Sequence, residues 1–508
     1  MSNSKRVIKN TIFLYIRMVV SILVNVFTTN ILLRALGASD YGLYNVVGGA
    51  VAMLNFLSAS MSSVTQRFLN YAEGAGDEVK IIKIFNNAKV IHYAIALFTA
   101  VFLIGAGFAF FNGILNIPVG REFPAMIVYA CLIFSIVFSI TITPYDAVLN
   151  AHENMLYYSI LGIVDVIAKL LIAVAIMYAD IDRLILYAVL MAAESWLFQL
   201  VTKHYCTKHY TECKPGLISK NIDKKIIQEM SSFAGWNTLN ITTGMLSLYG
   251  MNIILNHFYG TMANAAMGIA TQVTGVLMGV SGNMLKALTP MLVKSEASQQ
   301  RTKMLDISYI GCKYSYLLFS FFCIPIFIVM PTVLELWLGD VPEWTSLFCR
   351  LMIISTLVEQ LFVFLYQTIN AHGNIRNYNI TRSVTNILPI ISSVICCSYG
   401  MHAYWVIINW IIFKAIAGGV VNLYYCNKNV GLKFSSFINR VIFPTVVVTI
   451  IPVVLYNMYA ITYTVSSTNA HDIMLLLFLF AINIPLYLYL GMGQTERERI
   501  FRIIKDNV

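Results

Sequence analysis

The sequence predicts an all-α polytopic membrane protein with about 14 transmembrane helices, arranged as two parallel six-helix lobes, two C-terminal helices and a central cleft. Hydrophobic residues make up 58% of the chain and charged residues only 11%, whereas about a quarter of the residues in a soluble domain are charged. Apolar stretches of about 20 residues recur along the whole chain, and each could cross roughly 30 Å of hydrocarbon as a helix. These runs are continuous and do not alternate with polar residues, which argues against a membrane barrel.

Fourteen apolar runs are long enough to be spans. The first begins after Lys5, Arg6 and Lys9, continues past Arg17 and lacks a small-residue cleavage site, so we expect it to remain as a span. Several runs exceed the length that a bilayer requires, which indicates tilt or protrusion. The predicted spans are residues 7–36, 41–69, 82–111, 123–149, 157–178, 184–204, 231–258, 262–293, 307–329, 347–370, 383–399, 402–425, 438–458 and 473–490.

Lysine and arginine are distributed unevenly between the two sides of the predicted bundle. If the N-terminus is cytoplasmic, 23 of the 34 lysines and arginines fall in cytoplasmic segments and 8 fall within spans. Only Arg34, Arg121 and Arg183 then lie outside. Cytoplasmic loops of membrane proteins carry an excess of these residues, so we expect both termini in the cytoplasm. The net charge of +10 has the same cause and does not indicate a nucleic-acid partner.

The chain contains an internal repeat. The motif Asn-Ala-His-x-Asn occurs at residues 150–154 and again 220 positions later, at residues 370–374. A glycine that follows an apolar run, Gly37, is matched by Gly260. Repeats at this scale indicate duplicated halves, and the six spans between the copies give both halves the same orientation. The predicted organisation is an N-lobe (1–205), a basic cytoplasmic linker (206–230), a C-lobe (231–427), and two final spans with a basic tail (428–508).

Basic side chains outnumber acidic ones within the predicted spans. An ionisable residue in a span is costly and usually faces a cavity or a partner, so the excess favours a cavity that holds an anion. Some of these residues have structural explanations: Asp165 and Lys169 have the spacing of a helical ion pair, and Arg67 and Arg350 could extend to the interface. The bases are Arg17, Arg67, Lys89, Lys169, Lys286, Lys313, Arg350 and Lys414, and the acids are Asp146, Asp165, Glu194 and Glu359.

Polar stripes on spans one, two, seven and eight support such a cavity, although helix packing explains about half of their small residues. We expect Arg17 and Lys286 to contact the ligand, because both lie deep in their spans. His152 and His372 are instead expected to cap or pack at helix ends. The candidate substrate-binding residues are Arg17, Asn25, Asn55, Gln66, Arg67, Lys89, His92, Asn237, Asn240, Gln272, Lys286 and Lys313.

The motifs of several enzyme and pump classes are missing. The sequence has no G-x-x-x-x-G-K-[ST] phosphate-binding loop, no H-E-x-x-H metal motif and no dinucleotide fingerprint. Its nine cysteines show no paired metal-ligand spacing, and no disulfide framework is expected. The outer loops are too short for a catalytic domain. We therefore expect no catalytic residues, no metal and no cofactor, and transport driven downhill, by membrane potential, or by H⁺ or Na⁺ as the coupling ion.

Three segments carry a resemblance to a known family: Lys9-Asn10-Thr11, Leu36-Gly-Ala-Ser-Asp-Tyr-Gly-Leu-Tyr44 and Asn150-Ala-His-Glu153. With them the chain resembles the multidrug/oligosaccharidyl-lipid/polysaccharide (MOP) exporter superfamily, and within it the Wzx-type flippases of the polysaccharide branch. The resemblance implies alternating access between two lobes in the bacterial inner membrane. The implied cargo is an undecaprenyl-pyrophosphate-linked oligosaccharide for O-antigen lipopolysaccharide, capsule or exopolysaccharide synthesis. Membrane lipid and a polysaccharide polymerase or chain-length assembly are the implied partners.

Three other functions remain open from the sequence. A drug/cation antiporter of the same superfamily would prefer cavity acids and twelve spans. A peptidoglycan-precursor flippase would share the span count and differ in its cargo. A membrane glycosyl polymerase or ligase belongs to a different class, and it should carry a long outer loop with catalytic residues.

Overall fold

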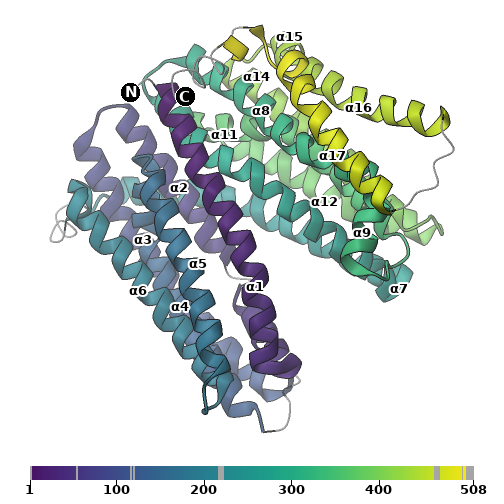
Figure 1. The fold of residues 1–508 in the computed structure, drawn as a ribbon. Coiled ribbons are helices and arrows are strands. Elements are labelled where there is room, and N and C mark those ends of the chain that lie inside the picture. Colours follow the sequence, from purple (N-terminus) through teal and green to yellow (C-terminus); the bar gives the residue numbers. More distant parts are fainter. Residues whose placement is uncertain are drawn as a thin grey trace. The chain divides into compact units, whose positions relative to one another are not determined.

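The computed structural model describes residues 3–52, 55–114, 117, 120–214, 222–462, 469–494 and 496–498 (Figure 1). All regular elements within these residues are helices, which confirms the predicted fold class. The chain divides into two compact units. The first unit covers Arg6–Thr238, and the second covers Leu239 onward together with a few N-terminal residues.

The first unit is a bundle in which α4 packs against α2, α3 and α6, while α5 packs against α6. A buried apolar cluster that includes Leu103, Val128 and Ile140 joins α1, α3, α4 and α6. Its elements are α1 (Asn3–Ala52), α2 (Asn55–Gly74), α3 (Glu78–Ala109), the π-turn η1 (Phe110–Ile114), α4 (Glu122–Ala151), α5 (Met155–Met177), α6 (Arg183–His209), the 3₁₀ turn η2 (Thr211–Cys213) and the beginning of α7 (Lys224–Ala297).

Local capping explains where several helices of the first unit begin. The side chain of Asp77 accepts a hydrogen bond from the Lys80 backbone N–H at the start of α3. Asp182 accepts from the backbone of Leu184 and Ile185 at the start of α6. Such acceptors satisfy the N–H groups that the first turn of a helix leaves without partners.

The second unit is built around α8, which packs against α10, α11, α16 and α17 (Figure 1). One of its apolar clusters includes Phe319, Phe348, Ile353 and Trp410. Besides the remainder of α7, its elements are α8 (Arg301–Ile328), α9 (Met330–Leu338), α10 (Thr345–Leu361), α11 (Val363–His372), α12 (Arg376–Ser398), α13 (Tyr404–Trp410), η3 (Ile411–Ala417), α14 (Gly418–Val430), α15 (Phe434–Phe437), η4 (Ile438–Ile442), α16 (Phe443–Thr462), α17 (Asn469–Leu486) and η5 (Tyr487–Gly491).

Eleven helices among the described residues are long and apolar enough to cross a membrane, or up to 12 with one bent pair. This number is roughly consistent with the 14 predicted spans. The second predicted span runs over residues 53 and 54, which lie outside the described residues. The seventh and eighth both fall in α7, whose 74 residues would extend about 110 Å as a straight helix. Gly260, with φ 78° and ψ −171°, interrupts α7 between these two spans.

The sequence repeat has counterparts in the backbone. Gly37 in α1 and Gly260 in α7 both have φ of 78°, a conformation that glycine adopts without steric cost. The residue after each repeated histidine also has positive φ, 55° at Glu153 and 97° at Gly373. In both units a residue with positive φ therefore follows the repeated histidine at the helix end.

Side-chain contacts repeat at the same offset of 220 positions. The Cys206 thiol lies 3.7 Å from the carbonyl oxygen of Tyr145 in the first unit. In the second, the Cys426 thiol lies 3.3 Å from the carbonyl oxygen of Leu365. Both cysteines are buried, so each anchors the last helix of its six-helix repeat to the helix that carries the Asn-Ala-His motif. The proposed domain limits remain a prediction.

Candidate functional site

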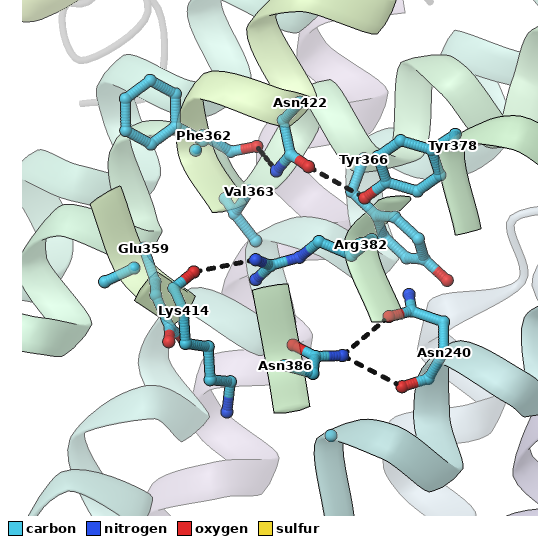
Figure 2. Close-up of a pocket in the computed structure, with 13 residues that line it drawn as sticks. Asn240, Glu359, Phe362, Val363, Tyr366, Tyr378, Arg382, Asn386, Lys414 and Asn422 are labelled. Carbon is cyan, nitrogen blue, oxygen red and sulfur yellow. Dashed lines mark hydrogen bonds between the residues drawn. The ribbon is translucent and has the colours of Figure 1, made fainter. Parts of the chain in front are cut away.

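A pocket of about 240 Å³ lies within the second unit and gathers polar side chains from α7, α10, α11, α12, η3 and α14 (Figure 2). It contains two basic groups and one carboxyl group, together with amide and phenol side chains. The residues that line it are Asn240, Gly244, Glu359, Phe362, Val363, Tyr366, Tyr378, Arg382, Asn386, Lys414, Ala415, Gly419 and Asn422.

Arg382 lies on the second turn of α12 and is held by two hydrogen bonds. Its Nη1 atom donates to the carbonyl oxygen of Lys414 at 2.8 Å and to Thr385 Oγ1 at 3.0 Å. The guanidinium packs so closely on Gly418 that a Cβ atom there would lie 1.4 Å from Arg382 Nη1. No carboxylate among the described residues forms an ion pair with Arg382, so its charge is available to a ligand.

Lys414 lies on the π-helical segment η3, a type of irregularity that is frequent at functional sites. Its ammonium is 3.6 Å from the centroid of the Trp410 ring, a cation–π contact. Glu359 is its acidic neighbour, yet no ion pair joins the two in the described structure. Buried Oε1 of Glu359 also lacks a hydrogen-bond partner there. The pocket therefore has an excess of positive charge.

Amide side chains line the pocket together with these cations. Asn386 Nδ2 donates to Asn240 Oδ1 at 3.1 Å and to Thr243 Oγ1 at 3.2 Å. The Tyr378 hydroxyl donates to Asn422 Oδ1 at 2.8 Å (Figure 2). These bonds fix the orientation of the amides, and amides offer both donors and acceptors to a polar ligand.

The equivalent position in the first unit carries the opposite charge. Lys414 is 220 positions after Glu194, which lies in a pocket of about 190 Å³ between α4, α5 and α6. Both carboxylate oxygens of Glu194 are buried and have no hydrogen-bond partner among the described residues. Nearby, Lys169 Nζ lies 2.8 Å from Asp165 Oδ2, which confirms the ion pair predicted from their spacing. The two equivalent positions thus carry a lysine in one pocket and a glutamate in the other.

No protein-family model and no curated protein matches the chain, whereas solved structures do. The crystal structure of MATE in the bent conformation matches with a TM-score of 0.73 and 13% identity, over 86% of this chain and 97% of that one. The outward-facing conformation of a multidrug resistance MATE family transporter of the MOP superfamily matches with a TM-score of 0.72 and 13% identity over the same shares. The chain has the MATE transporter fold.

A third match is a MOP superfamily transporter from Pyrococcus furiosus, with a TM-score of 0.68 and 11% identity over 84% of this chain and 96% of that one. The reverse polarity of its binding pocket is said to suggest a different function. The MATE fold and the long apolar helices support a multi-pass membrane protein. At these identities the likeness shows the fold, and it leaves the branch and the cargo to be proposed.

Within this MATE fold, the predicted arginines of the first unit stack on aromatic rings. The Arg17 guanidinium lies 4.4 Å from the centroid of the Tyr158 ring and packs against Gly162. The Arg67 guanidinium lies 4.9 Å from the Phe68 ring centroid and a similar distance from the ring centroids of two neighbouring aromatic residues. Both arginines are therefore held by packing as well as by charge.

Lys89 and His92 are buried in α3. Lys89 Nζ lies 5.6 Å from the centroid of the Phe85 ring. His92 Nδ1 donates to the Ala88 carbonyl oxygen at 2.8 Å, while its buried Nε2 atom has no partner among the described residues. Neither residue lines the pocket that contains Arg382.

The remaining predicted residues are divided between the two units. Asn237 donates to Ser60 Oγ at 3.2 Å in the first unit, and Lys313 pairs with Glu496 at 2.6 Å in the second. Of the predicted set, Asn240 is the residue that lines the basic pocket. Asn25, Gln272 and Lys286 are exposed, Gln66 is half-buried, and the side chain of Asn55 lies outside the described residues.

The two repeated histidines lie at helix ends, as predicted. His152 is the C-cap residue of α4, and its Nε2 donates to Glu212 Oε1 at 2.6 Å. His372 is the last residue of α11, and its Nδ1 donates to Glu296 Oε1 at 3.1 Å. Burial raises the pKa of the Glu212 carboxyl, but the hydrogen bond from His152 and its other contacts outweigh burial, so the pKa is lowered overall.

Sequence reasoning missed the two basic residues of the pocket as site residues. The predicted span 383–399 leaves Arg382 in a connecting segment, whereas α12 begins at Arg376. Lys414 was counted as a base within a span but was not assigned to the site. The repeat contained a usable signal, since Lys414 replaces Glu194 at the equivalent position.

Proposed function

We propose that the chain is a membrane exporter that moves an undecaprenyl-pyrophosphate-linked oligosaccharide across the bacterial inner membrane by alternating access. Its use would be in O-antigen, capsule or exopolysaccharide synthesis, with both termini in the cytoplasm. The observation that carries this proposal is the pair Arg382 and Lys414. These two cations line one pocket, and no carboxylate among the described residues forms an ion pair with either of them.

The two cations suit a phosphate group. Arginine can donate two parallel hydrogen bonds to phosphate oxygens, and lysine supplies a mobile point charge. Because Arg382 Nη1 is bonded to the main-chain carbonyl oxygen of Lys414, the two residues lie side by side in the pocket. A phosphate would draw the Lys414 ammonium from the Trp410 ring, since an ionic hydrogen bond is stronger than a cation–π contact.

The size of the pocket limits what it can hold. About 240 Å³ accommodates a phosphate or pyrophosphate group, but not an oligosaccharide with its lipid. The pocket is therefore proposed as the phosphate subsite, with the sugar and the lipid tail outside it. This chemistry is shared by a peptidoglycan-precursor flippase, so the saccharide distinguishes the two functions.

The first unit offers the coupling ion a separate place. The buried oxygens of Glu194 have no hydrogen-bond partner among the described residues, and Asp165 and Lys169 are its charged neighbours. A carboxylate in this position is stabilised by binding H⁺ or Na⁺. We propose that ion binding here drives transport. The same buried Glu194 carboxylate favours drug/cation antiport as the alternative function.

Complementation tests the proposal. The host lacks its own lipid-linked oligosaccharide exporter, and surface polysaccharide is measured together with the membrane level of the protein. We expect Arg382→Gln and Lys414→Met to abolish or strongly reduce export at normal protein levels, and Lys414→Arg to retain it. Lys428→Met, which removes an exposed charge from α14, is the matched control and should export normally.

Two results would contradict the proposal. Full export by the double variant Arg382→Gln/Lys414→Met would show that the basic pocket is not used. Drug resistance that depends on Glu194 and not on Lys414, without any export of polysaccharide, would favour the antiporter. A polymerase or ligase would instead lengthen or attach glycan without moving it across the membrane.

A further inference from the structure

A second pocket in the second unit, of about 610 Å³, is larger than the candidate site and separate from it. It lies between α8, the π-turn η4 with the start of α16, and the residues that follow η5. The beginnings of two candidate spans, Arg301–Ile328 and Phe434–Tyr456, and the end of a third, Asp472–Gly491, therefore meet here. Such a position places the pocket at one membrane–water interface.

Lys313 is the buried cation of this pocket. Its side chain is 9% exposed, and its Nζ atom lies 2.6 Å from Glu496 Oε2. Glu496 follows the last membrane helix, so the ammonium extends to the level where that span has ended. A lysine within a span commonly reaches the interface in this way. The same Glu496 oxygen also accepts a hydrogen bond from the Gly493 backbone N–H at 2.8 Å.

The rim of the pocket carries a second, weaker ion pair. Arg440 Nη1 lies 2.8 Å from Asp306 Oδ1, and their side chains are 60% and 58% exposed. The Arg440 guanidinium also lies 5.4 Å from the centroid of the Tyr309 ring. An exposed pair of this kind contributes little to stability, so Arg440 can exchange Asp306 for another anion at low cost.

Apart from Asn439 the rest of the lining is mostly apolar, with Ile310, Pro444 and Leu490 beside these charged groups. Charged groups at the interface with apolar surface next to them match an amphiphile that has an anionic head. We propose that this pocket binds the phosphate headgroup of an anionic membrane lipid between Lys313 and Arg440. The Glu496 carboxylate forms an ion pair with Lys313 when the lipid is absent.

The proposal makes Glu496 a competitor of the lipid. A carboxylate and a phosphate oxygen accept the same hydrogen bonds from an ammonium, and Glu496 lies on a short turn beyond the last membrane helix. Removing the Glu496 charge should therefore raise lipid affinity. If the ion pair only stabilises the fold, the same substitution should lower stability and leave lipid binding unchanged. The two explanations therefore predict different results when Glu496 loses its charge.

The test uses the purified full-length protein in detergent, with retained lipid counted by native mass spectrometry and stability followed by thermal unfolding. Phosphatidylglycerol is compared with phosphatidylcholine, and inorganic phosphate is the soluble probe. We expect Glu496→Gln to tighten phosphatidylglycerol binding about tenfold and Lys313→Met to weaken it about tenfold, the effect of one charge-assisted contact. Arg440→Gln, an exposed change, should also weaken it.

Lys303→Met is the matched control, because Lys303 is exposed on the first turn of α8 and contacts Gln300 outside the pocket. It should bind phosphatidylglycerol like the unchanged protein. The proposal is overturned if Glu496→Gln leaves binding unchanged or weaker, or if Lys313→Met and Arg440→Gln bind like the control. Equal stabilisation by inorganic phosphate and by phosphatidylglycerol would overturn the assignment to a lipid.

Discussion

Replacement of Lys414 by methionine removes one of the two cations of the basic pocket while keeping a side chain of similar length. The Trp410 ring remains, and Arg382 still donates to the main-chain carbonyl oxygen of Lys414, because this hydrogen bond does not involve the ammonium group. We therefore expect the variant to fold and to lose affinity for a phosphate-bearing ligand.

The magnitude follows from the contact that is lost. A hydrogen bond to a charged group contributes about 1.5–3 kcal/mol, which corresponds to a loss of affinity of about 10- to 150-fold at 1.4 kcal/mol per factor of ten. Full Coulomb attraction at 4 Å would give about 4 kcal/mol at an effective dielectric constant of 20. The smaller figure is appropriate because Arg382 remains and the half-buried pocket admits water.

Binding of undecaprenyl pyrophosphate to the purified protein in lipid nanodiscs measures this loss directly. Lys414→Arg should bind within a few-fold of the unchanged protein, since it keeps the charge, and Lys428→Met should bind normally. The reasoning is refuted if Lys414→Met binds as tightly as the unchanged protein, or if it loses no more affinity than Lys428→Met.

Three other predictions concern different parts of the molecule. Gly418→Ala should displace the Arg382 guanidinium, because its Cβ would overlap Nη1; anion affinity should fall while the melting temperature changes little. Glu194→Gln should abolish the dependence of transport on an imposed pH or Na⁺ gradient yet leave pyrophosphate binding intact; transport that still follows the gradient would contradict this. The lowered pKa of Glu212 means that its contact with His152 stabilises the fold above the unfolded carboxyl pKa of about 4.3 and that this stability is lost as the pH falls below it. Unfolding measured from about pH 6 to about pH 2 should show a steeper acid loss below pH 4.3 for the unchanged protein than for Glu212→Gln.

The fold was predictable because the membrane imposes it. Unpaired backbone groups are too costly in hydrocarbon, so long apolar runs must be helices, and a duplicated motif such as that around His152 and His372 reveals the repeat. The break in α7 at Gly260 falls between predicted spans seven and eight, although no loop separates the two helices there.

The candidate site was predicted less well, for geometric reasons. Hydropathy indicates which segment is in the membrane but not the direction in which a side chain points. Lys286 is exposed, and its contact with the ligand stays a prediction. The span predicted from residue 383 leaves Arg382 in a connecting segment, whereas α12 already begins at Arg376. Errors of a few residues at a span boundary are common. The boundary predicted at residue 383 comes just after Arg382 and therefore leaves this pocket residue outside the predicted helix.

Transport in a defined system tests the central claim most directly. The purified protein is reconstituted into vesicles with a fluorescent undecaprenyl-pyrophosphate-linked oligosaccharide, and its movement between leaflets is followed by quenching of the exposed label. We expect protein-dependent movement that the double variant Arg382→Gln/Lys414→Met abolishes and Lys428→Met does not. Movement at the same rate with the double variant, or movement of cationic drugs but not of the lipid-linked saccharide, would contradict the account.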